Sequence, residues 1–211
     1  MEKSEKIVVI VANTSHMKYT KEINDTIDLA SKARGTGISR RTDEYINKKM
    51  QEGKAIIALD GDNFAGFIYI ESWSHTKFIA NSGLIVKEEY RGLGLAKKIK
   101  RASFALSRRL FPESKIFGLT TGLAVMKINS ELKYRPVPFS ELTDDELFWK
   151  GCSSCINYDI LMRTNKSKCL CTGMLFDPAW KKVNSKKQNK DEDSLMDIVN
   201  NQSQMQVLKA I

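Results

Sequence analysis

The chain has 211 residues, and its 34 Lys and Arg against 25 Asp and Glu give a formal net charge of +9. Hydrophobic residues make up 42% and charged residues 28%, which is typical of a globular chain with a sizeable core and excludes a low-complexity chain. The apolar runs are far shorter than the roughly 20 residues of a membrane helix, and the polar start 1–6 does not fit a secretory signal. We therefore expect a cytoplasmic protein without a membrane partner, whose four cysteines are thiols or metal ligands.

The N-terminal half predicts one strand, two helices and three further strands. The β-branched run 7–12 predicts a buried strand, and Thr14 or Ser15 could cap a helix that continues to about residue 33. A glycine-containing segment breaks this helix, and Thr42 opens a second helix that ends near Met50. Three strands then follow in close succession, which predicts an antiparallel meander. These strands cover residues 54–59, 64–73 and 76–86.

The second half begins with a helical period and returns to short strands. Apolar residues spaced three and four apart predict an amphipathic helix over 94–110. A strand at 115–120, a helix at 124–132, a weak strand at 134–139 and a last strand at 169–176 follow. Thr143 with Glu146 fits the capping box of a further helix.

The composition divides the chain into a domain and an appendage. We expect one mixed α+β domain over 1–178, followed by a flexible linker and a helical tail over 179–211. The tail helix, about 194–211, could dock on the domain or pair with a second protomer in a homodimer. An isolated helix of this length is marginal in water, so we favour a mobile appendage.

A glycine-rich turn lies between the third strand of the meander and the helix 94–110. Glycine permits positive φ and close approach of a ligand, and free N–H groups at a helix start attract an anion. The spacing fits neither a Walker loop nor a dinucleotide fingerprint, because Lys97 stands where a third glycine is needed. The expected pyrophosphate-binding groups are Gly92, Leu93, Gly94, Leu95 and Ala96. A plain turn with a helix cap is the alternative.

Basic residues surround this turn. Seven basic residues and no acidic one lie between positions 91 and 109, which indicates either a solvated helix face or a site for a phosphorylated ligand. They are Arg91, Lys97, Lys98, Lys100, Arg101, Arg108 and Arg109. We do not expect a nucleic acid as the partner. Binding of a nucleic acid would weaken steeply with salt and would need no second ligand, which distinguishes it.

Arg91, Gly94 and Ala96 fit the pattern Gln/Arg-x-x-Gly-x-Gly/Ala. With the order of the elements around them, the chain resembles the GCN5-related N-acetyltransferase (GNAT) superfamily over about residues 7–176. The resemblance implies the GNAT fold, a central mostly antiparallel sheet flanked by helices, with acetyl-CoA or another acyl-CoA between splayed fourth and fifth strands. It implies direct transfer of the acyl group to a small-molecule amine. A backbone N–H near Leu84, Ile85 or Val86 would stabilise the oxyanion.

The same resemblance suggests the groups that move protons. A carboxylate base is expected at the end of the third strand, which points to Glu71, with His75 as a second candidate. The family often has a tyrosine acid five residues before an aromatic residue. With Tyr134 as that aromatic residue, the acid position falls on Asn129, which cannot donate a proton. The thiolate would then leave unprotonated or take a proton from water, and a non-catalytic acyl-CoA sensor is the alternative function.

The loop between the first two helices contains Arg34, Arg40 and Arg41, which could bind a carboxylate of the acceptor. A surface loop with incidental charge is the alternative. The segments 34–38, 83–86 and 148–152 resemble a Bacteroidetes acetyltransferase-like group linked with arginine biosynthesis. That resemblance implies amino-acid metabolism, with an amino acid such as glutamate as acceptor and acetyl- or succinyl-CoA as donor.

Four cysteines stand as a Cys-x-x-Cys pair and a Cys-x-Cys pair, with thirteen residues between them. They are Cys152, Cys155, Cys169 and Cys171. Two such pairs in a cytosolic protein could form a tetrahedral structural zinc site over 152–171, with the second pair on one face of the last strand. Reactive thiols beside lysines, or buried thiols that behave as small hydrophobic groups, are the alternatives.

Overall fold

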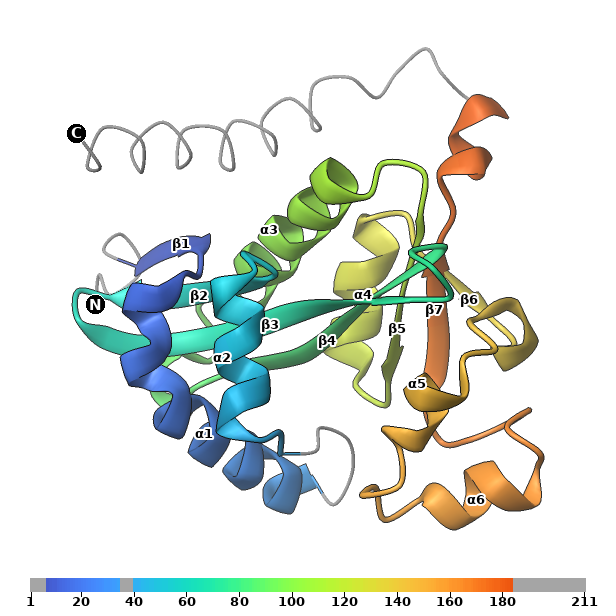
Figure 1. Cartoon of the computed structure of the whole chain (residues 1–211), viewed down its shortest axis with the longest axis horizontal. Helices are drawn as coiled ribbons and strands as arrows, with labels where there is room; N and C mark the ends of the chain where they lie inside the picture. The colour runs from blue at the N-terminus through green and yellow to red at the C-terminus, as the bar shows by residue number, and fades with distance from the viewer. Residues whose placement is uncertain (1–6, 35–39, 184–211) are drawn as a thin grey trace.

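The computed structural model describes residues 7–34 and 40–183 and contains a seven-stranded mixed sheet (Figure 1). The strand order is β1-β2-β3-β4-β5-β7-β6, and all neighbouring pairs are antiparallel except β4 and β5. The strands are β1 (Ile7–Val11), β2 (Ala55–Asp60), β3 (Asn63–Trp73), β4 (Phe78–Val86), β5 (Lys115–Thr120), β6 (Arg135–Val137) and β7 (Thr172–Phe176). The predicted mixed α+β class, with a mostly antiparallel sheet, is confirmed.

Six α-helices and four short 3₁₀ helices surround this sheet within the described residues. The α-helices are α1 (Thr20–Arg34), α2 (Asp43–Gln51), α3 (Leu95–Leu110), α4 (Leu123–Glu131), α5 (Glu146–Lys150) and α6 (Tyr158–Arg163). The 3₁₀ helices are η1 (Thr14–Tyr19), η2 (Glu88–Tyr90), η3 (Phe139–Glu141) and η4 (Pro178–Val183). None of the helices in these ranges is long and apolar enough to span a bilayer.

The helices cover the sheet from both faces (Figure 1). On one face, Ile23 and Ile27 of α1 and Met50 of α2 pack with Phe67 of β3 in one apolar cluster. On the other face, the apolar stripe of α3 packs against β2, β3 and β4 in a second cluster. A third cluster joins α5 and α6 to β5 and β7 through the buried side chains of Trp149, Leu161 and Phe117. The sheet therefore has α1 and α2 over one half of a face, and α5 and α6 over the other half.

The meander of β2, β3 and β4 contains an irregularity near the end of β4. The pairing shifts between Phe67 with Ile85 and Tyr69 with Ser82, so β4 carries an additional residue there. Gly83 lies in this bulge with φ +72°, and a Cβ at this position would stand 2.5 Å from Cε1 of Tyr69. Glycine is therefore required by both the backbone conformation and the contact with the tyrosine ring.

The pairing between β4 and β5 is short. These parallel strands pair at Phe78–Lys115, Ile79–Ile116 and Ala80–Phe117. β4 continues to Val86 and β5 to Thr120 without further pairing to each other. The two strands therefore diverge, as the resemblance to the GNAT superfamily implied.

Several local predictions are wrong. Asn13, and not Thr14 or Ser15, caps the first helical segment, which begins as the 3₁₀ helix η1 before α1. Asp145, and not Thr143, caps α5, because its carboxylate accepts a hydrogen bond from the N–H of Leu147 at 3.0 Å.

The second cysteine pair also lies outside the strand to which it was assigned. β7 begins only at Thr172, so Cys169 and Cys171 lie in the preceding loop, and α6 was not predicted at all. The predicted tail helix lies outside the described residues.

The bulge at Gly83 leads to a stability prediction. We expect Gly83→Ala to lower the free energy of unfolding by about 3 kcal/mol, because it adds a steric overlap to the cost of a positive φ. Gly61→Ala is the matched control, since Gly61 has φ +59° and no atom within 4 Å of the added methyl group, and should cost only about 1 kcal/mol. Urea unfolding of both variants measures the difference, and equal losses would contradict a requirement imposed by Tyr69.

Candidate active site

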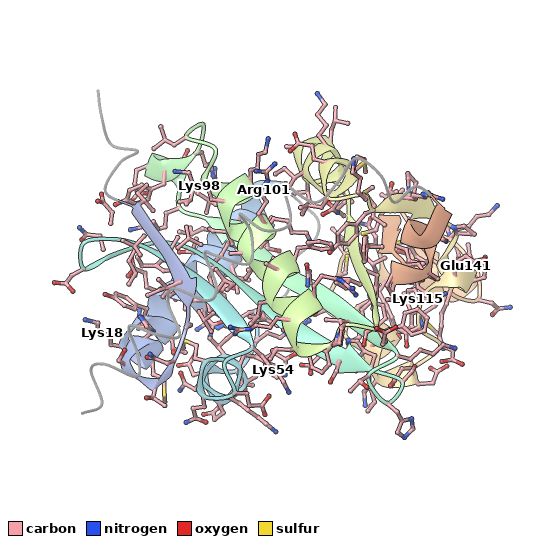
Figure 2. The ribbon with its side chains drawn as sticks, turned by 90° about the horizontal axis from the view of Figure 1, so that it is seen from above. Lys18, Lys54, Lys98, Arg101, Lys115 and Glu141 are labelled. Atoms are coloured by element: carbon pink, nitrogen blue, oxygen red, sulfur yellow. The ribbon has the colours of Figure 1, made fainter. Side chains whose placement is uncertain are left out.

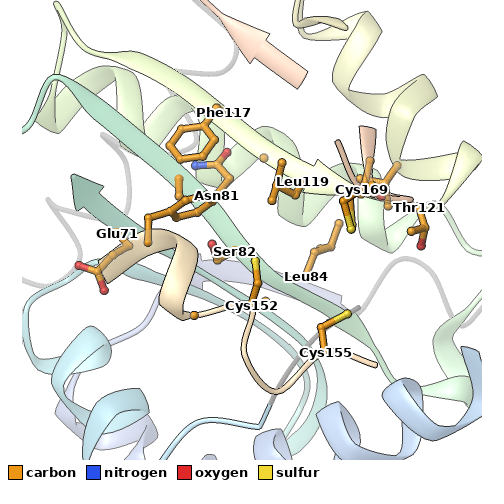
Figure 3. A pocket seen from close by; sticks show the side chains of 18 of the residues that line it. Glu71, Asn81, Ser82, Leu84, Phe117, Leu119, Thr121, Cys152, Cys155 and Cys169 are labelled. Atoms are coloured by element: carbon orange, nitrogen blue, oxygen red, sulfur yellow. The ribbon is translucent and has the colours of Figure 1, made fainter. Parts of the chain in front are cut away.

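A cleft of about 680 Å³ lies where β4 and β5 diverge (Figure 3). Consecutive residues of both strands line it, 80–84 of β4 and 117–121 at the end of β5. Successive side chains of a strand point to opposite faces of a sheet, so one face alone would contribute alternate residues. The facing edges of the two strands therefore form the walls of the cleft.

Other parts of the chain also line the cleft. Arg41 and Tyr45 line it beside β3, while Phe148 and Trp149 line it from α5. Through the gap between the strands, the cleft is also lined by Lys100 of α3 and Asn129 of α4. The cleft thus connects the face covered by α1 and α2 with the helices behind the sheet.

Glu71, the candidate base, lines the cleft and is held by two neighbours. Its carboxylate forms an ion pair with the buried ammonium of Lys49 and accepts a hydrogen bond of 2.5 Å from the hydroxyl of Tyr45. Burial and nearby groups raise the pKa of Tyr45, so this hydroxyl keeps its proton. His75, the second candidate, lies in the exposed β3–β4 hairpin and does not line the cleft.

The three predicted arginines have different places in the structure. Arg41 lines the cleft, and its Nε donates a hydrogen bond of 3.1 Å to the hydroxyl of Tyr69. Arg40 instead forms ion pairs with Asp25 at 3.5 Å and Asp28 at 2.5 Å on the exposed side of α1. The side chain of Arg34 lies outside the described residues.

The predicted anion-binding turn follows β4 and η2. Gly92 and Gly94 have φ of +78° and +71°, and Gly94 caps α3 without a side-chain hydrogen bond. The first hydrogen bonds of α3 run from the N–H groups of Lys97 and Lys98 to the carbonyl of Gly94. The preceding N–H groups, those of Leu95 and Ala96, therefore lack an intrahelical acceptor.

This turn lies beyond the Leu84 end of the cleft and contributes none of the lining residues. Of the three candidate oxyanion positions, Leu84 lines the cleft, whereas the side chains of Ile85 and Val86 pack into the clusters on the two faces of the sheet. Arg91 folds back toward β4, with its Nε 3.4 Å from the carbonyl oxygen of Val86.

The basic residues around the turn do not form one free surface. Lys97 and Arg101 both lie near Glu131 of α4, at 2.7 Å and 3.9 Å. Lys100 points inward and is only 2% exposed, whereas Lys98 is exposed on α3 (Figure 2). The sequence stretch therefore combines surface charge with one buried cation.

A polar cluster lies behind the gap between β4 and β5. The hydroxyl of Tyr134 donates a hydrogen bond of 3.0 Å to Oδ1 of Asn81, and the amide of Asn81 donates one of 2.9 Å to Ser107. Asn129 is 1% exposed, its Nδ2 lies 3.7 Å from the sulfur of Met174, and its Oδ1 has no partner within the described residues. Burial alone lowers the pKa of Lys100 to about 7.

The four cysteines line the cleft on the side of α5 and α6, and Figure 3 labels Cys152, Cys155 and Cys169 among the lining side chains. All four are free thiols, and burial raises the pKa of Cys152 to about 11 and that of Cys171 to about 12. Residues 7–34 and 40–183 contain no group of three or more His, Cys, Asp or Glu side chains placed to hold a metal ion. The predicted zinc site thus has no support from the structure.

Sequence reasoning missed several residues of this site. Tyr45, Lys49 and Tyr69 were not singled out, although they hold Glu71 and Arg41 in place. Lys100 was counted only as one of the seven basic residues between positions 91 and 109, interpreted as a solvated helix face or a site for a phosphorylated ligand. A sequence signal for its burial was present. Lys100, Ser103 and Ser107 are spaced three and four residues apart, so they lie on one side of α3 beside its apolar stripe.

Comparisons with known proteins agree with this architecture. Residues 23–119 match the Acetyltransferase (GNAT) family. No curated protein is significantly similar to the chain in sequence. Among solved structures, N-acetylglutamate synthase from Neisseria gonorrhoeae complexed with coenzyme A and N-acetyl-glutamate has a TM-score of 0.58 and 14% identity. The match covers 81% of this chain and 35% of that chain, so the chain spans about a third of the length of that enzyme.

Two shorter proteins match over nearly their full length. Rv2747 from Mycobacterium tuberculosis, in complex with CoA and NLQ, has a TM-score of 0.56 and 18% identity, with 81% of this chain and 98% of that chain covered. The putative acetyltransferase yncA from Salmonella typhimurium, with its cofactor acetyl-CoA, has a TM-score of 0.56 and 11% identity, with 82% and 94% covered. At these identities the likeness establishes the fold, and the predicted GNAT fold is confirmed.

The contact between Lys49 and Glu71 leads to a second stability prediction. We expect Lys49→Met to lower the free energy of unfolding by about 2 kcal/mol, because it leaves a mostly buried carboxylate without its cation. Lys48→Met is the matched control, since Lys48 is 68% exposed and lies 3.9 Å from Glu52, and should change stability by less than about 0.5 kcal/mol. Urea unfolding at pH 7 compares the two variants, and an unchanged Lys49→Met would show that the ion pair contributes no stability.

Proposed function

We propose that the chain transfers an acetyl or succinyl group from acyl-CoA to the amine of a small molecule, because residues 23–119 match the Acetyltransferase (GNAT) family and the chain has the GNAT fold. The observation that carries this proposal is the early end of β4–β5 pairing at Ala80 and Phe117, which opens a cleft between the strands. Structures of this fold contain CoA or acetyl-CoA, which supports acyl-CoA as the donor for this chain.

The donor site in this proposal uses the turn and the edge of β4. The turn 91–96 holds the pyrophosphate through Gly92, Gly94 and the N–H groups that precede the first hydrogen bond of α3. The acyl group then lies in the cleft beside Leu84, where a backbone N–H of β4 stabilises the oxyanion as it forms. The amine attacks the thioester directly, without a covalent intermediate on the protein.

The acceptor in this proposal enters between α2 and α5. Arg41 is a permanent cation in the wall of the cleft, beside the hydroxyl of Tyr69, and suits a carboxylate of the acceptor. Glu71 lines the same wall and is the candidate to accept a proton from the amine, through water. An amino acid such as glutamate offers both the carboxylate and the amine, and with this acceptor the proposed reaction belongs to amino-acid metabolism.

Two further expectations stand apart from this reaction. Structural zinc at the four cysteines is not part of the proposal, since the described residues form no metal-binding group. A homodimer through the tail 194–211 stays a prediction, because the tail lies outside the described residues.

A non-catalytic sensor of acyl-CoA is the second candidate function. The observation that favours it is Asn129, which occupies the position expected for a tyrosine acid and cannot donate a proton. A sensor would bind acyl-CoA in the same cleft but would release no thiol in the presence of an acceptor.

Thiol release distinguishes the two candidates. We expect acetyl-CoA or succinyl-CoA to release free thiol only when an acceptor from an amino-acid panel that includes glutamate is present. The rise in melting temperature on adding each acyl-CoA, measured in parallel, reports binding without turnover. Binding without turnover across the panel would favour the sensor, and no binding of either donor would refute the donor site at the turn 91–96.

The place of Arg41 yields a prediction about acceptor recognition. We expect Arg41→Gln to raise KM for a carboxylate-bearing acceptor about 10-fold or more and to change kcat little, because a carboxylate loses its charged partner before and during reaction. Arg40→Gln is the matched control, since Arg40 pairs with Asp25 and Asp28 outside the cleft, and should leave KM unchanged. Steady-state kinetics tests both variants, and equal KM values for them would remove Arg41 from the acceptor site.

A further inference from the structure

Lys100 is a cation buried in the wall of the cleft. It lies on α3, is 2% exposed and lines the cleft from behind the gap between β4 and β5. Within the described ranges, no carboxylate forms an ion pair with it, and its Nζ lies 5.1 Å from the ring centroid of Tyr134. Burial is the only cause of its lowered pKa of about 7, so its amine exchanges a proton near neutral pH.

The backbone of β5 keeps the space in front of this amine open. A Cβ at Gly118 would stand 3.4 Å from the carbonyl oxygen of Asn81 and 4.0 Å from Nζ of Lys100. A side chain at position 118 would therefore fill the gap between the diverging strands. With glycine there, the Lys100 amine borders the space in which the thioester would lie.

The neighbours of Lys100 cannot supply a proton near neutral pH. Burial raises the pKa of Tyr134 well above its ordinary value, and its hydroxyl proton is already donated to Asn81. Asn129 does not titrate, and its buried Oδ1 has no partner among the described residues. The other titratable groups in the lining are Glu71, Arg41, Tyr45, Tyr69 and Tyr158, and the thiols near α5 and α6. None of them contributes to the shift at Lys100.

We propose, on the basis of the acyl transfer proposed above, that Lys100 donates the proton that the CoA thiolate needs as it leaves. The neutral amine of the acceptor forms a bond to the carbonyl carbon, and the carbon–sulfur bond breaks with its electron pair on sulfur. The Lys100 ammonium gives a proton to this sulfur. The proton that the attacking nitrogen loses returns to the Lys100 amine, so the step leaves an amide, a thiol and the starting ammonium.

With Lys100 as the proton donor, the reaction does not need a tyrosine acid at the position of Asn129. A general acid works best when its pKa is close to the working pH, and an ordinary thiol has a pKa of about 8.5. An ammonium with a pKa near 7 is therefore acidic enough to protonate a thiolate and still partly charged at neutral pH. An ordinary exposed lysine would hold its proton too tightly for the same transfer.

Lys100→Met tests the proposal, because it keeps an unbranched side chain of similar length and removes the proton donor. We expect kcat with acetyl-CoA to fall about 100-fold or more, within the range for loss of a general acid. Lys127→Met is the matched control, since Lys127 is exposed on α4, does not line the cleft and should leave kcat unchanged. The rise in melting temperature with acetyl-CoA should remain in both variants.

Two readouts separate proton donation from a structural role. A thioester of 4-nitrothiophenol, whose thiolate is stable without a proton, should restore most of the rate of Lys100→Met relative to wild type. The pH profile of the wild type should be bell-shaped, with kcat falling above about pH 7, and Lys100→Met should lack that falling limb. Equal losses with both donors, or an unchanged falling limb, would overturn the proposal.

A third readout does not depend on turnover. The ultraviolet absorbance of the bound CoA thiolate should appear at lower pH in the wild type than in Lys100→Met, because the ammonium stabilises the thiolate. Identical titrations would overturn the contact between Lys100 and the sulfur. A wild type that shows this difference but turns over no acceptor would refute the proposed function and the catalytic role together, and would leave only the contact.

Discussion

The parallel pairing of β4 with β5 lasts for only three residue pairs, and the whole site depends on its early end at Ala80 and Phe117. Beyond this point each strand keeps its antiparallel neighbour, β3 or β7, so the sheet stays intact on both sides of the gap. The exposed strand edges leave backbone groups that another strand does not satisfy. A ligand with its own amide groups is the natural partner of such edges, and the pantetheine arm of CoA has two amides.

Two glycines keep this gap in its observed form. Gly83 permits the bulge near the end of β4, and Tyr69 packs where a side chain at position 83 would stand. Gly118 places no side chain between the strands beside the Lys100 amine, and both residues line the cleft. The same tyrosine that packs on Gly83 accepts a hydrogen bond from Arg41, so the shape of the β4 edge is linked to the placement of the Arg41 guanidinium.

Sequence patterns predicted the elements well wherever a period was long or a turn was marked by glycine. The stripe of α3, the meander of β2 to β4 and the turn before α3 were all found, because each depends on local spacing. The predictions failed where contacts between residues far apart in the sequence determine the local structure. The loop before β7 contains Cys169 and Cys171 in place of a strand, and α6 gave no periodic signal because it is only six residues long. The sequence also contained no sign of how the two neighbouring arginines differ. Arg41 lines the cleft, whereas Arg40 pairs with Asp25 and Asp28.

Lys100 shows most clearly why a charge count cannot replace a structure. In the sequence it belongs to a run of seven basic residues, and such a run normally forms a solvated face. In the helix it stands in line with Ser103 and Ser107, on the side that faces the sheet at the gap. A cation buried without an acidic partner costs free energy, and it persists in a fold only where the surroundings are fixed by other contacts. Here those contacts are the apolar packing of Ile99 and Ala102 on either side of Lys100. This packing offsets the free-energy cost of burying the ammonium and holds the amine at the cleft.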